Sequence, residues 1–325
     1  MKERIVSGIQ PSGEMHIGNY LGALKDFVEL QDKFECFFFI ADLHSLTEDF
    51  DPEEKTKQIM ELAETFLALG LDPKKCTMFI QSHIPAHSEL AWILNTVTPM
   101  NELERMTQYK DKALRQKKNI NVGLFDYPVL QAADILLYHP QYVPVGHDQV
   151  QHLEMTNLIA KKFNNRYGEY FQEIKPHAKN PVRVMSLSEP EKKMSKSEPE
   201  STINIFDEPE IIKKKLAKAV TATDAPKGTT PKGVQNLFDL LETFGKEELL
   251  QKFKKEYNDN TIKYSELKSA LADSISDYFS PMRTAKTKIH QNQDQIVEIL
   301  QAGAAKAAAV ANQTLSEIKT KLGLL

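Results

Sequence analysis

The sequence predicts an α/β fold, with a doubly wound parallel sheet in the first part of the chain and an all-helical domain after it. Three observations predict this class. Short, continuous apolar runs alternate with amphipathic stretches near the start of the chain, and only helical periodicity follows residue 208. The chain has 325 residues, of which 41% are hydrophobic and 26% charged, so it can bury a sizeable core and is not disordered as a whole.

The alternation of strands and helices predicts the first three strands of the sheet. Residues 5–9 form an apolar run, which is followed by a loop rich in Pro, Ser and Gly and by a periodic helix over 19–33. Residues 36–41 form a second apolar run, a helix near 53–69 follows, and residues 77–80 form a third run. Continuous apolar strands separated by helices are typical of a parallel sheet with helices on both faces.

The rest of the chain is predicted to be mostly helical. A strand candidate at 142–145 lies within the helical region 87–165 and leads into a helix over 147–164. Residues 190–209 are polar and rich in Ser, Glu and Pro, which predicts a mobile loop. Further helices are expected at 208–220, 234–257, 264–289 and 293–321, and the alanine-rich stretch 302–311 is expected to let the last one pack closely on its neighbour. We therefore predict two domains, 1–205 with a helical insertion at about 84–145, and 206–325.

The cysteine and histidine patterns exclude several kinds of site. Cys36 and Cys76 form no C-x-x-C pair, which excludes a disulfide framework, a zinc ribbon and an iron–sulfur cluster built by this chain alone. His147 and His152 are spaced i, i+5 without an H-E-x-x-H motif or a cysteine partner, so no metal site is expected. No apolar run approaches ~18 residues and the first four residues do not begin a signal peptide, so we expect a cytoplasmic protein with no membrane partner.

The segment between the first strand and its helix is a candidate phosphate-binding loop. It contains Gly13, His16, Gly18 and Asn19 at a strand-to-helix junction, where backbone N–H groups and the helix dipole favour anions. The glycines permit close approach, and His16 and Asn19 can donate hydrogen bonds to phosphate. The segment is neither G-x-G-x-x-G nor a P-loop, and an ordinary strand–loop–helix turn with a solvent-facing histidine is the alternative.

A second motif, Lys193-Met194-Ser195-Lys196-Ser197, lies in the polar loop 177 residues after His16. Two lysines that flank a serine on a mobile loop can act as a movable cationic clamp for a pyrophosphate leaving group. A solvated charged loop is the alternative.

Together, His16-Ile17-Gly18-Asn19 and Lys193-Met194-Ser195-Lys196-Ser197 resemble the H-I-G-H and K-M-S-K-S signatures of class I aminoacyl-tRNA synthetases. Within that class the chain resembles the bacterial tryptophanyl-tRNA synthetases along essentially its whole length. The matching segments are S-G-I-Q-P-S-G at 7–13, L-E-R-M-T-Q at 103–108, Y-P at 127–128, A-A-D-I-L-L-Y at 132–138, V-P-V-G at 143–146 and D-Q at 148–149. The sequence departs from the common family pattern at three positions. Asn19 replaces a histidine, Gln131 stands where methionine is common, and His147 stands where glutamate is frequent.

The resemblance implies a Rossmann-like class I catalytic domain at 1–205 and a tRNA anticodon-binding domain at 206–325. It implies activation of L-tryptophan with ATP and Mg²⁺, the metal bound by the ATP phosphates, transfer to tRNA(Trp), and a homodimer. The implied catalytic residues are His16, Asn19, Lys193 and Lys196. The implied ATP-binding residues are Gln10, Pro11, Ser12, Gly18, Asn19, Gly146, His147, Asp148, Val184, Lys193, Met194, Ser195, Lys196 and Ser197.

Asp134 is the candidate that would select the amino acid. It lies in an apolar helix, where a carboxylate is costly unless it is paired. The resemblance implies that it accepts the indole N–H of tryptophan, a donor that phenylalanine lacks. By the same resemblance, the tryptophan-binding residues are completed by Gln149, His44, Tyr127, Gln131 and Val6. The alternative is a structural aspartate bonded to a lysine or to the backbone.

The charge pattern predicts contact with RNA. Nine basic and four acidic side chains lie between residues 161 and 197, and lysines at 213–215 and 218 follow. This pattern predicts contact with a tRNA backbone, and a solvated surface is the alternative.

Three other functions compete with this interpretation. A tyrosyl-tRNA synthetase would share both signatures, but Val6 stands where a partner for a phenol is expected. An inactive RNA-binding paralogue would not need His16, Lys193 and Lys196. A small nucleotidylyltransferase would lack the lysine motif and the helical tail.

Overall fold

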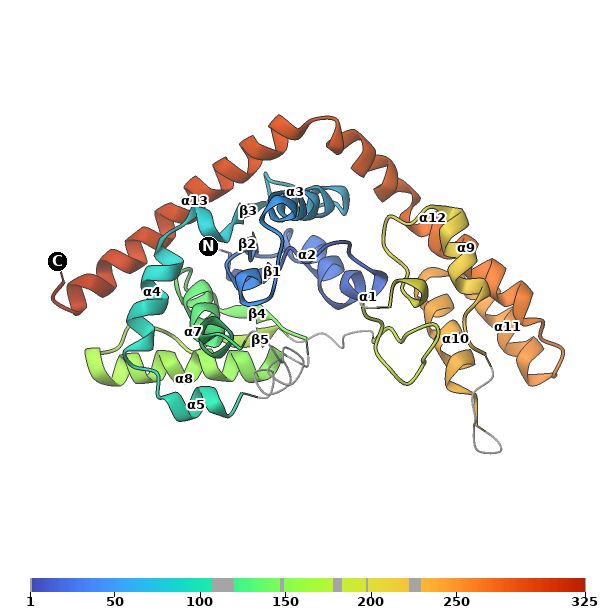
Figure 1. Ribbon diagram of the computed structural model, residues 1–325, viewed down its shortest axis with the longest axis horizontal. Coiled ribbons are helices and arrows are strands. Elements are labelled where there is room, and N and C mark those ends of the chain that lie inside the picture. Colours follow the sequence, from blue (N-terminus) through green and yellow to red (C-terminus); the bar gives the residue numbers. More distant parts are fainter. Residues whose placement is uncertain are drawn as a thin grey trace. The chain divides into compact units, whose positions relative to one another are not determined.

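Figure 1 shows the computed structural model of the chain, which describes residues 2–106, 120–146, 149–177, 183–196, 198–221 and 229–324. The predicted α/β class is confirmed, because a five-stranded sheet with the order β3-β2-β1-β4-β5 has only parallel strand pairs among its described residues. Its strands are β1 Arg4–Ile9, β2 Glu35–Ile40, β3 Cys76–Ile80, β4 Tyr142–Pro144 and β5 Lys175–His177. The first four were predicted, whereas the short edge strand β5 was not.

Strands β2 and β3 are buried almost from end to end, and β1 is buried at Ile5 and Val6. In the ladder between β1 and β2, Val6 pairs with Phe37 and Gly8 with Phe39. Gly8 has no room for a side chain, because a Cβ there would lie 2.3 Å from the Phe39 ring. At their carboxyl ends the strands β1, β2 and β3 run into polar turns that begin near Gln10, His44 and Gln81, at the edge of the sheet where open α/β folds bind ligands.

The chain forms two compact units. Unit 1 consists of Met1–Gly13, Asp26–Asn180 and Ile289–Leu325, and unit 2 consists of Glu14–Lys25 and Pro181–Lys288. These units do not coincide with the predicted domains 1–205 and 206–325, which stay a prediction. No described helix is both long enough and apolar enough to cross a membrane.

Unit 1 carries the sheet and the helices that pack on it. These helices are α3 Pro52–Ala68, α4 Ala86–Asn95, α5 Met100–Glu104, α7 Val122–Leu136, α8 Val150–Tyr167 and α13 Gln293–Lys321, with most of α2 Lys25–Leu30. Helix α7 begins at its cap residue Asn121, whose side-chain oxygen accepts the Leu124 N–H at 2.9 Å. It packs against both α4 and α8, and its Asp134 side chain is buried.

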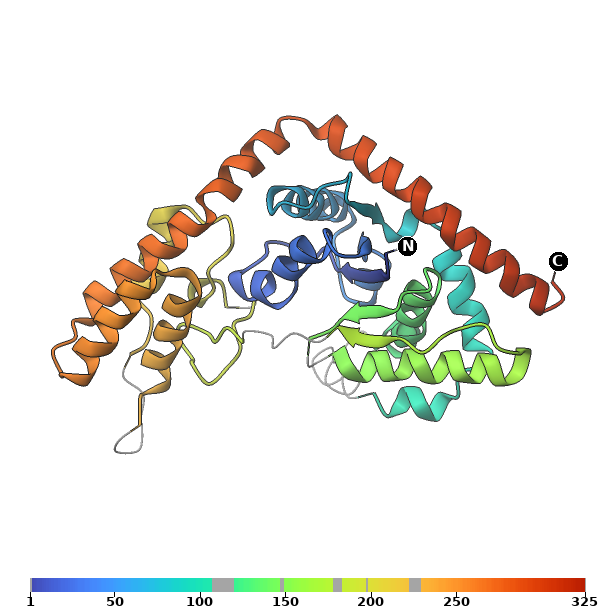
Figure 2. The same cartoon turned by 180° about the vertical axis from the view of Figure 1, so that it is seen from behind.

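The last helix, α13, covers the edge strand β3, and Figures 1 and 2 both show it beside β3 and α4. A Cβ at Gly303 would lie 1.8 Å from the Met78 carbonyl oxygen, and Ala307 and Ala311 are fully buried. This confirms the prediction that the alanine-rich stretch lets the helix pack closely on its neighbour. Covering the edge removes a row of backbone groups that could pair with another chain.

Unit 2 is helical apart from its loops. It contains α1 Ile17–Asn19, the π-helical segment η1 Tyr20–Leu24, α9 Pro209–Ala217, α10 Lys232–Phe244, α11 Glu247–Asn258 and most of α12 Tyr264–His290. The predicted helix over 234–257 is divided into α10 and α11, which end and begin on either side of Gly245. In the core of the unit, Tyr20 packs edge-to-face on Phe279 and its hydroxyl shares a 2.8 Å hydrogen bond with that of Tyr278.

Candidate active site

His16 and Asn19 cap the start of α1 by bonding to each other. The His16 backbone N–H donates to Asn19 Oδ1 at 3.1 Å, and the Asn19 backbone N–H donates to His16 Nδ1 at 3.3 Å. Because Nδ1 accepts, the ring proton of neutral His16 resides on Nε2, which stays available as a donor. Gly18 is required beside this cap, since a Cβ there would lie 2.8 Å from His16 Nδ1.

Backbone hydrogen bonds join the His16 turn to the stretch that follows the lysine motif within unit 2. The Ile17 N–H donates to the Ile203 carbonyl at 3.0 Å, and the Ile205 N–H donates to the Met15 carbonyl at 2.9 Å. The lysine loop (residues 193–197) is held on its other side, where the Met194 N–H donates to the Val184 carbonyl at 3.0 Å. The stretch predicted as a mobile loop is largely without regular structure but has a 3-10 turn at Pro199–Ser201; its mobility stays a prediction.

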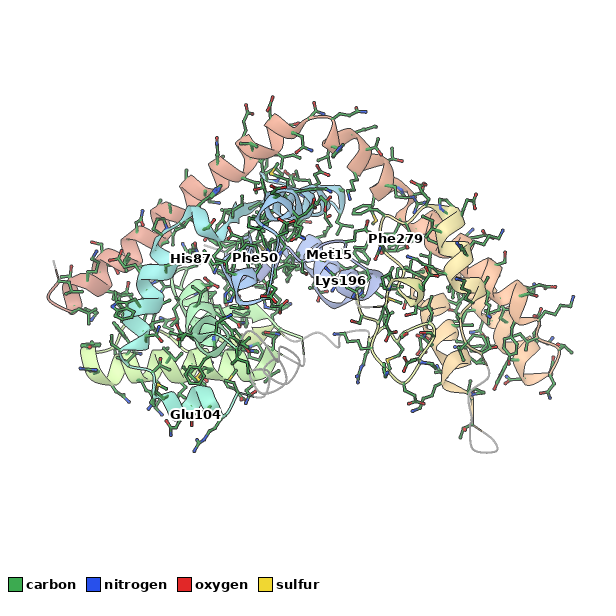
Figure 3. The ribbon with its side chains drawn as sticks, viewed as in Figure 1. Met15, Phe50, His87, Glu104, Lys196 and Phe279 are labelled. Atoms are coloured by element: carbon green, nitrogen blue, oxygen red, sulfur yellow. The ribbon has the colours of Figure 1, made fainter. Side chains whose placement is uncertain are left out.

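The charges of this region act on one another. Burial, followed by the positive charges of Lys196 and Lys193, lowers the pKa of His16 to about 4, so its imidazole is neutral near pH 7. Burial also lowers the pKa of Lys196 to about 8, against an opposing effect of Glu14. The Lys196 Nζ lies 3.9 Å from the Met15 Sδ. Both residues are labelled in Figure 3. Cations that are costly to hold in the free protein would be stabilised by a bound polyphosphate.

In unit 1, Asp134 is the centre of a buried hydrogen-bonded cluster. Its Oδ2 accepts from His44 Nε2 at 2.7 Å, and its Oδ1 accepts from Gln81 Nε2 at 2.7 Å and from His87 Nδ1 at 2.6 Å. The carboxylate is 1% exposed. Burial by itself opposes ionisation, but the charge and hydrogen bonds of His44 and His87 outweigh it and hold the pKa of Asp134 below its usual value. The carboxylate is therefore an acceptor at neutral pH.

Three members of the Asp134 cluster (Asp134, His44, Gln81, His87 and Tyr138) were missed from the sequence. Gln81 and His87 follow β3, and both are fully buried. Tyr138 lies four residues after Asp134, and its hydroxyl is 2.8 Å from His87 Nε2. One signal was present, because Gln81 directly follows a buried strand, at the edge where such folds bind ligands.

The other predicted tryptophan-binding residues lie in unit 1 as well. Tyr127 shares a helix with Asp134, its ring centroid is 6.5 Å from that of His44, and its hydroxyl is 2.7 Å from His152 Nε2. Gln131 is partly exposed one turn before Asp134, and Gln149 is partly exposed at the start of α8. Val6 is fully buried in the apolar core. The structure thus brings His44, Tyr127 and Asp134 together.

The predicted ATP-binding residues divide between the units. Unit 1 contains Gln10, Pro11, Ser12 and Gly146, and unit 2 contains Gly18, Asn19, Val184, Lys193, Met194, Ser195 and Lys196. In unit 2, the buried Val184 lies 3.6 Å from where a Cβ on Gly18 would be. His147, Asp148 and Ser197 lie outside the described residues.

Comparison with known proteins gives consistent matches over the whole chain. The model of the family described as tRNA synthetases class I (W and Y) matches residues 2–280. The chain is 46% identical to a tryptophan–tRNA ligase of Caldanaerobacter subterraneus subsp. tengcongensis, covering 99% of each, and 44% identical to one of Clostridium tetani, covering 100% of this chain and 96% of the relative. A crystal structure of tryptophanyl-tRNA synthetase from Campylobacter jejuni complexed with ADP and tryptophan is similar with a TM-score of 0.87 and 37% identity, covering 99% of this chain and 100% of that one.

Proposed function

The chain belongs to the class I tRNA synthetases of the W and Y family, and from this premise we infer that it is a tryptophan–tRNA ligase. It activates L-tryptophan with ATP to tryptophanyl-adenylate and transfers the tryptophanyl group to tRNA(Trp). The observation that carries this function is the identity of 46% and 44%, over essentially the full chain, to relatives named for that activity.

The buried Asp134 supports tryptophan as the substrate. An ionised carboxylate accepts hydrogen bonds and does not donate them, which suits the single N–H of an indole. Phenylalanine would leave this acceptor short of one donor, and a tyrosine hydroxyl would have to be placed differently. A site built to receive an N–H can reject an analogue without it by about 10⁴-fold, so no editing site is needed. His44 and Tyr127 would form walls of the same pocket.

The residues of unit 2 support activation by positioning and charge. The tryptophan carboxylate is already a nucleophile and attacks the α-phosphate of ATP in line, while the bond to pyrophosphate breaks. The Nε2–H of the neutral His16 would donate to the phosphate chain. Lys193 and Lys196 would balance the negative charge that grows on the leaving pyrophosphate. Magnesium, which prefers oxygen ligands, would arrive on the ATP phosphates and screen their charge.

A homodimer is the assembly that the surface of unit 1 supports. Trp92 on α4, Met100 on α5 and Val122 on α7 are exposed by 73%, 65% and 80%. Single apolar residues are normal on a surface, but here they lie on helices that pack together, since α7 contacts both α4 and α5. A second copy of the chain would cover them.

The dimer can be tested with an intrinsic probe. Trp92 is the chain's single tryptophan, so its fluorescence emission should shift to the blue when the dimer forms and to the red on dilution. Val122→Glu should yield monomers in sedimentation experiments. A monomer at all concentrations, with an unchanging emission spectrum, would contradict the proposal.

Exposed basic side chains support contact with tRNA. Lys161 and Arg166 lie on α8, and Lys213 and Lys214 lie on α9. Not all of the basic cluster on α9 contributes, because Lys215 is paired with Asp207 at 2.7 Å. Contact of these side chains with the phosphate backbone of tRNA predicts that the KM for tRNA rises steeply with salt concentration. A cytoplasmic location would give the protein access to tRNA and ATP.

ATP–pyrophosphate exchange with each of the twenty amino acids tests the function. We expect exchange with tryptophan alone, and tryptophan-dependent charging of tRNA(Trp). A preference for tyrosine would show that the chain is a tyrosyl-tRNA synthetase. No exchange with any amino acid by folded protein that still binds tRNA would identify an inactive RNA-binding paralogue.

A further inference from the structure

We propose that Gln81 and His87 are positioning residues that hold Asp134 by its Oδ1 atom, so that Oδ2 is directed to the substrate indole. Tyr138 acts through His87. The inference rests on the proposed function, because it concerns how Asp134 receives the indole N–H.

The first step is the unequal sharing of donors between the two carboxylate oxygens. Oδ1 accepts from both Gln81 Nε2 and His87 Nδ1, at 2.7 and 2.6 Å. Among the residues that the structure describes, Oδ2 has His44 Nε2 as its hydrogen-bond donor, at 2.7 Å. Each carboxylate oxygen has two lone pairs. Oδ1 is therefore saturated, whereas Oδ2 can take one more donor.

The second step is that both donors to Oδ1 are themselves fixed. Gln81 Oε1 accepts the Leu43 N–H at 3.2 Å, which orients the amide so that its NH₂ group faces Asp134. His87 must donate from Nδ1 to the carboxylate, so in its neutral form Nε2 accepts the Tyr138 hydroxyl proton at 2.8 Å. Burial raises the pKa of Tyr138, which keeps that proton in place.

The third step is the consequence for recognition. A carboxylate can rotate about its last torsion angle, and two fixed donors on one oxygen stop that rotation. His87 also helps to keep the pKa of the buried Asp134 carboxyl low, after the larger effect of His44. A neutral acid at this place could present an O–H to the indole N–H. Among the residues that the structure describes, the titratable groups nearest to Asp134 in this cluster are His44, His87 and Tyr138. Gln81 also binds the turn that carries His44, so it positions both donor and acceptor at Oδ2.

The measurement compares tryptophan with β-(3-benzothienyl)alanine, an analogue of nearly the same shape in which sulfur replaces the N–H. The ratio of their kcat/KM values in ATP–pyrophosphate exchange reports the indole hydrogen bond alone. A residue that only supports the fold would lower both values together and leave the ratio unchanged.

The variants form matched pairs. Gln81→Met keeps the shape and removes the donor, so the ratio should fall by at least ~10-fold. An asparagine amide nitrogen superposes on histidine Nδ1 and a glutamine amide nitrogen on Nε2. His87→Gln should therefore lower the ratio by a similar factor, and His87→Asn should stay within about 3-fold of wild type. Tyr138→Phe should give a smaller fall, because the His87 ring remains.

Asp134→Ala distinguishes a failure of the role of Asp134 from a failure of the roles of Gln81 and His87. If wild-type protein does not discriminate between the two substrates, or keeps its discrimination in Asp134→Ala, the proposed role of Asp134 fails. If Asp134→Ala abolishes the discrimination while Gln81→Met and His87→Gln preserve it, Asp134 keeps its role and our inference is overturned. Should Gln81→Met fail to fold, as judged by circular dichroism, the comparison of His87→Asn with His87→Gln decides.

Discussion

The two regions that gather functional side chains are built in different ways. In unit 1, the Asp134 cluster is held by side chains from four parts of the chain, and each member is at most 7% exposed. In unit 2, the signature motifs are held by backbone hydrogen bonds, and Lys193 reaches solvent. One region is buried and built from side-chain hydrogen bonds, and the other is cationic and partly exposed.

The difference fits the roles that we propose for the two regions. Tryptophan differs from phenylalanine by one weak donor and a larger ring, so discrimination needs an acceptor out of water that is costly to leave unpaired. A polyphosphate carries several charges and is attracted by any accessible cations and N–H groups. We therefore expect unit 1 to control substrate choice and unit 2 to control the rate of activation, and variants in either unit can contradict that division.

The largest effect is expected at Asp134. Asp134→Ala should lower kcat/KM for tryptophan far more than for phenylalanine and collapse a ratio of about 10⁴ towards unity, because the acceptor that rejects phenylalanine is gone. Pyrophosphate exchange with both amino acids measures it. A protein that is merely weakened would lose both activities together. If the ratio survives, Asp134 is structural and the indole N–H has another partner.

Lys196→Ala should give the next largest effect, and on a different quantity. The positive charge of Lys196 matters most as negative charge grows on the pyrophosphate, so its loss should raise the activation barrier by roughly 3 kcal/mol, or about 10²-fold in kcat. The KM for tryptophan should change little. The opposite pattern, with kcat preserved and tryptophan affinity lost, would mean that Lys196 contributes to tryptophan binding, which we assign to unit 1.

The fold could be predicted better than the site because its signals are local. Apolar runs located four strands to within about two residues, since a buried strand is a contiguous stretch of sequence. The strand β5 escaped because it is three residues long and contains Pro176 between two polar residues, a pattern typical of a turn, although an edge strand tolerates proline. The π-helical segment η1 carries no composition signal of its own.

The Asp134 cluster and the signature motifs differ in the same way. The lysine loop and the His16 turn are contiguous motifs, so the sequence alone indicates them. The cluster around Asp134 draws on Gln81 and His87 from segments about 50 residues away, which only the packing of α7 on α4 and the β3 turn brings together. Asp134 itself was visible because a carboxylate in an apolar helix needs partners. The sequence alone could not identify these partners, because they come from segments that only the fold brings near Asp134.

The pH dependence should also separate the regions. Because burial lowers the pKa of Lys196 to about 8, this lysine loses its charge as the pH rises above that value, whereas His16, with a pKa of about 4, stays neutral throughout. The kcat/KM for ATP, which reports the free protein, should therefore fall by up to ~10-fold per pH unit above pH 8. Lys196→Arg, which stays charged, should flatten the profile.

The tryptophan-to-phenylalanine ratio should stay constant over the same pH range, since burial keeps the Tyr138 hydroxyl protonated and Asp134 is ionised. A ratio that changes in parallel with the ATP profile would mean that one ionisation controls both regions. A wild-type profile that stays flat to high pH would contradict the role given to Lys196.

The smallest effect is expected at the two cysteines, which belong to neither region. Cys36 and Cys76 are register partners at the amino ends of β2 and β3, opposite the end that carries His44 and Gln81. Burial raises the pKa of both thiols to about 12, so neither supplies a thiolate nucleophile. In-line attack by the substrate carboxylate needs no covalent intermediate, so Cys36→Ser and Cys76→Ser should leave pyrophosphate exchange within about 2-fold of wild type and cost about 1 kcal/mol of unfolding free energy. Exchange assays well below the melting temperature measure the activity, and thermal unfolding of the same samples measures the stability. Complete loss of exchange in a protein that remains folded would overturn the mechanism and place a third functional region at the far end of the sheet.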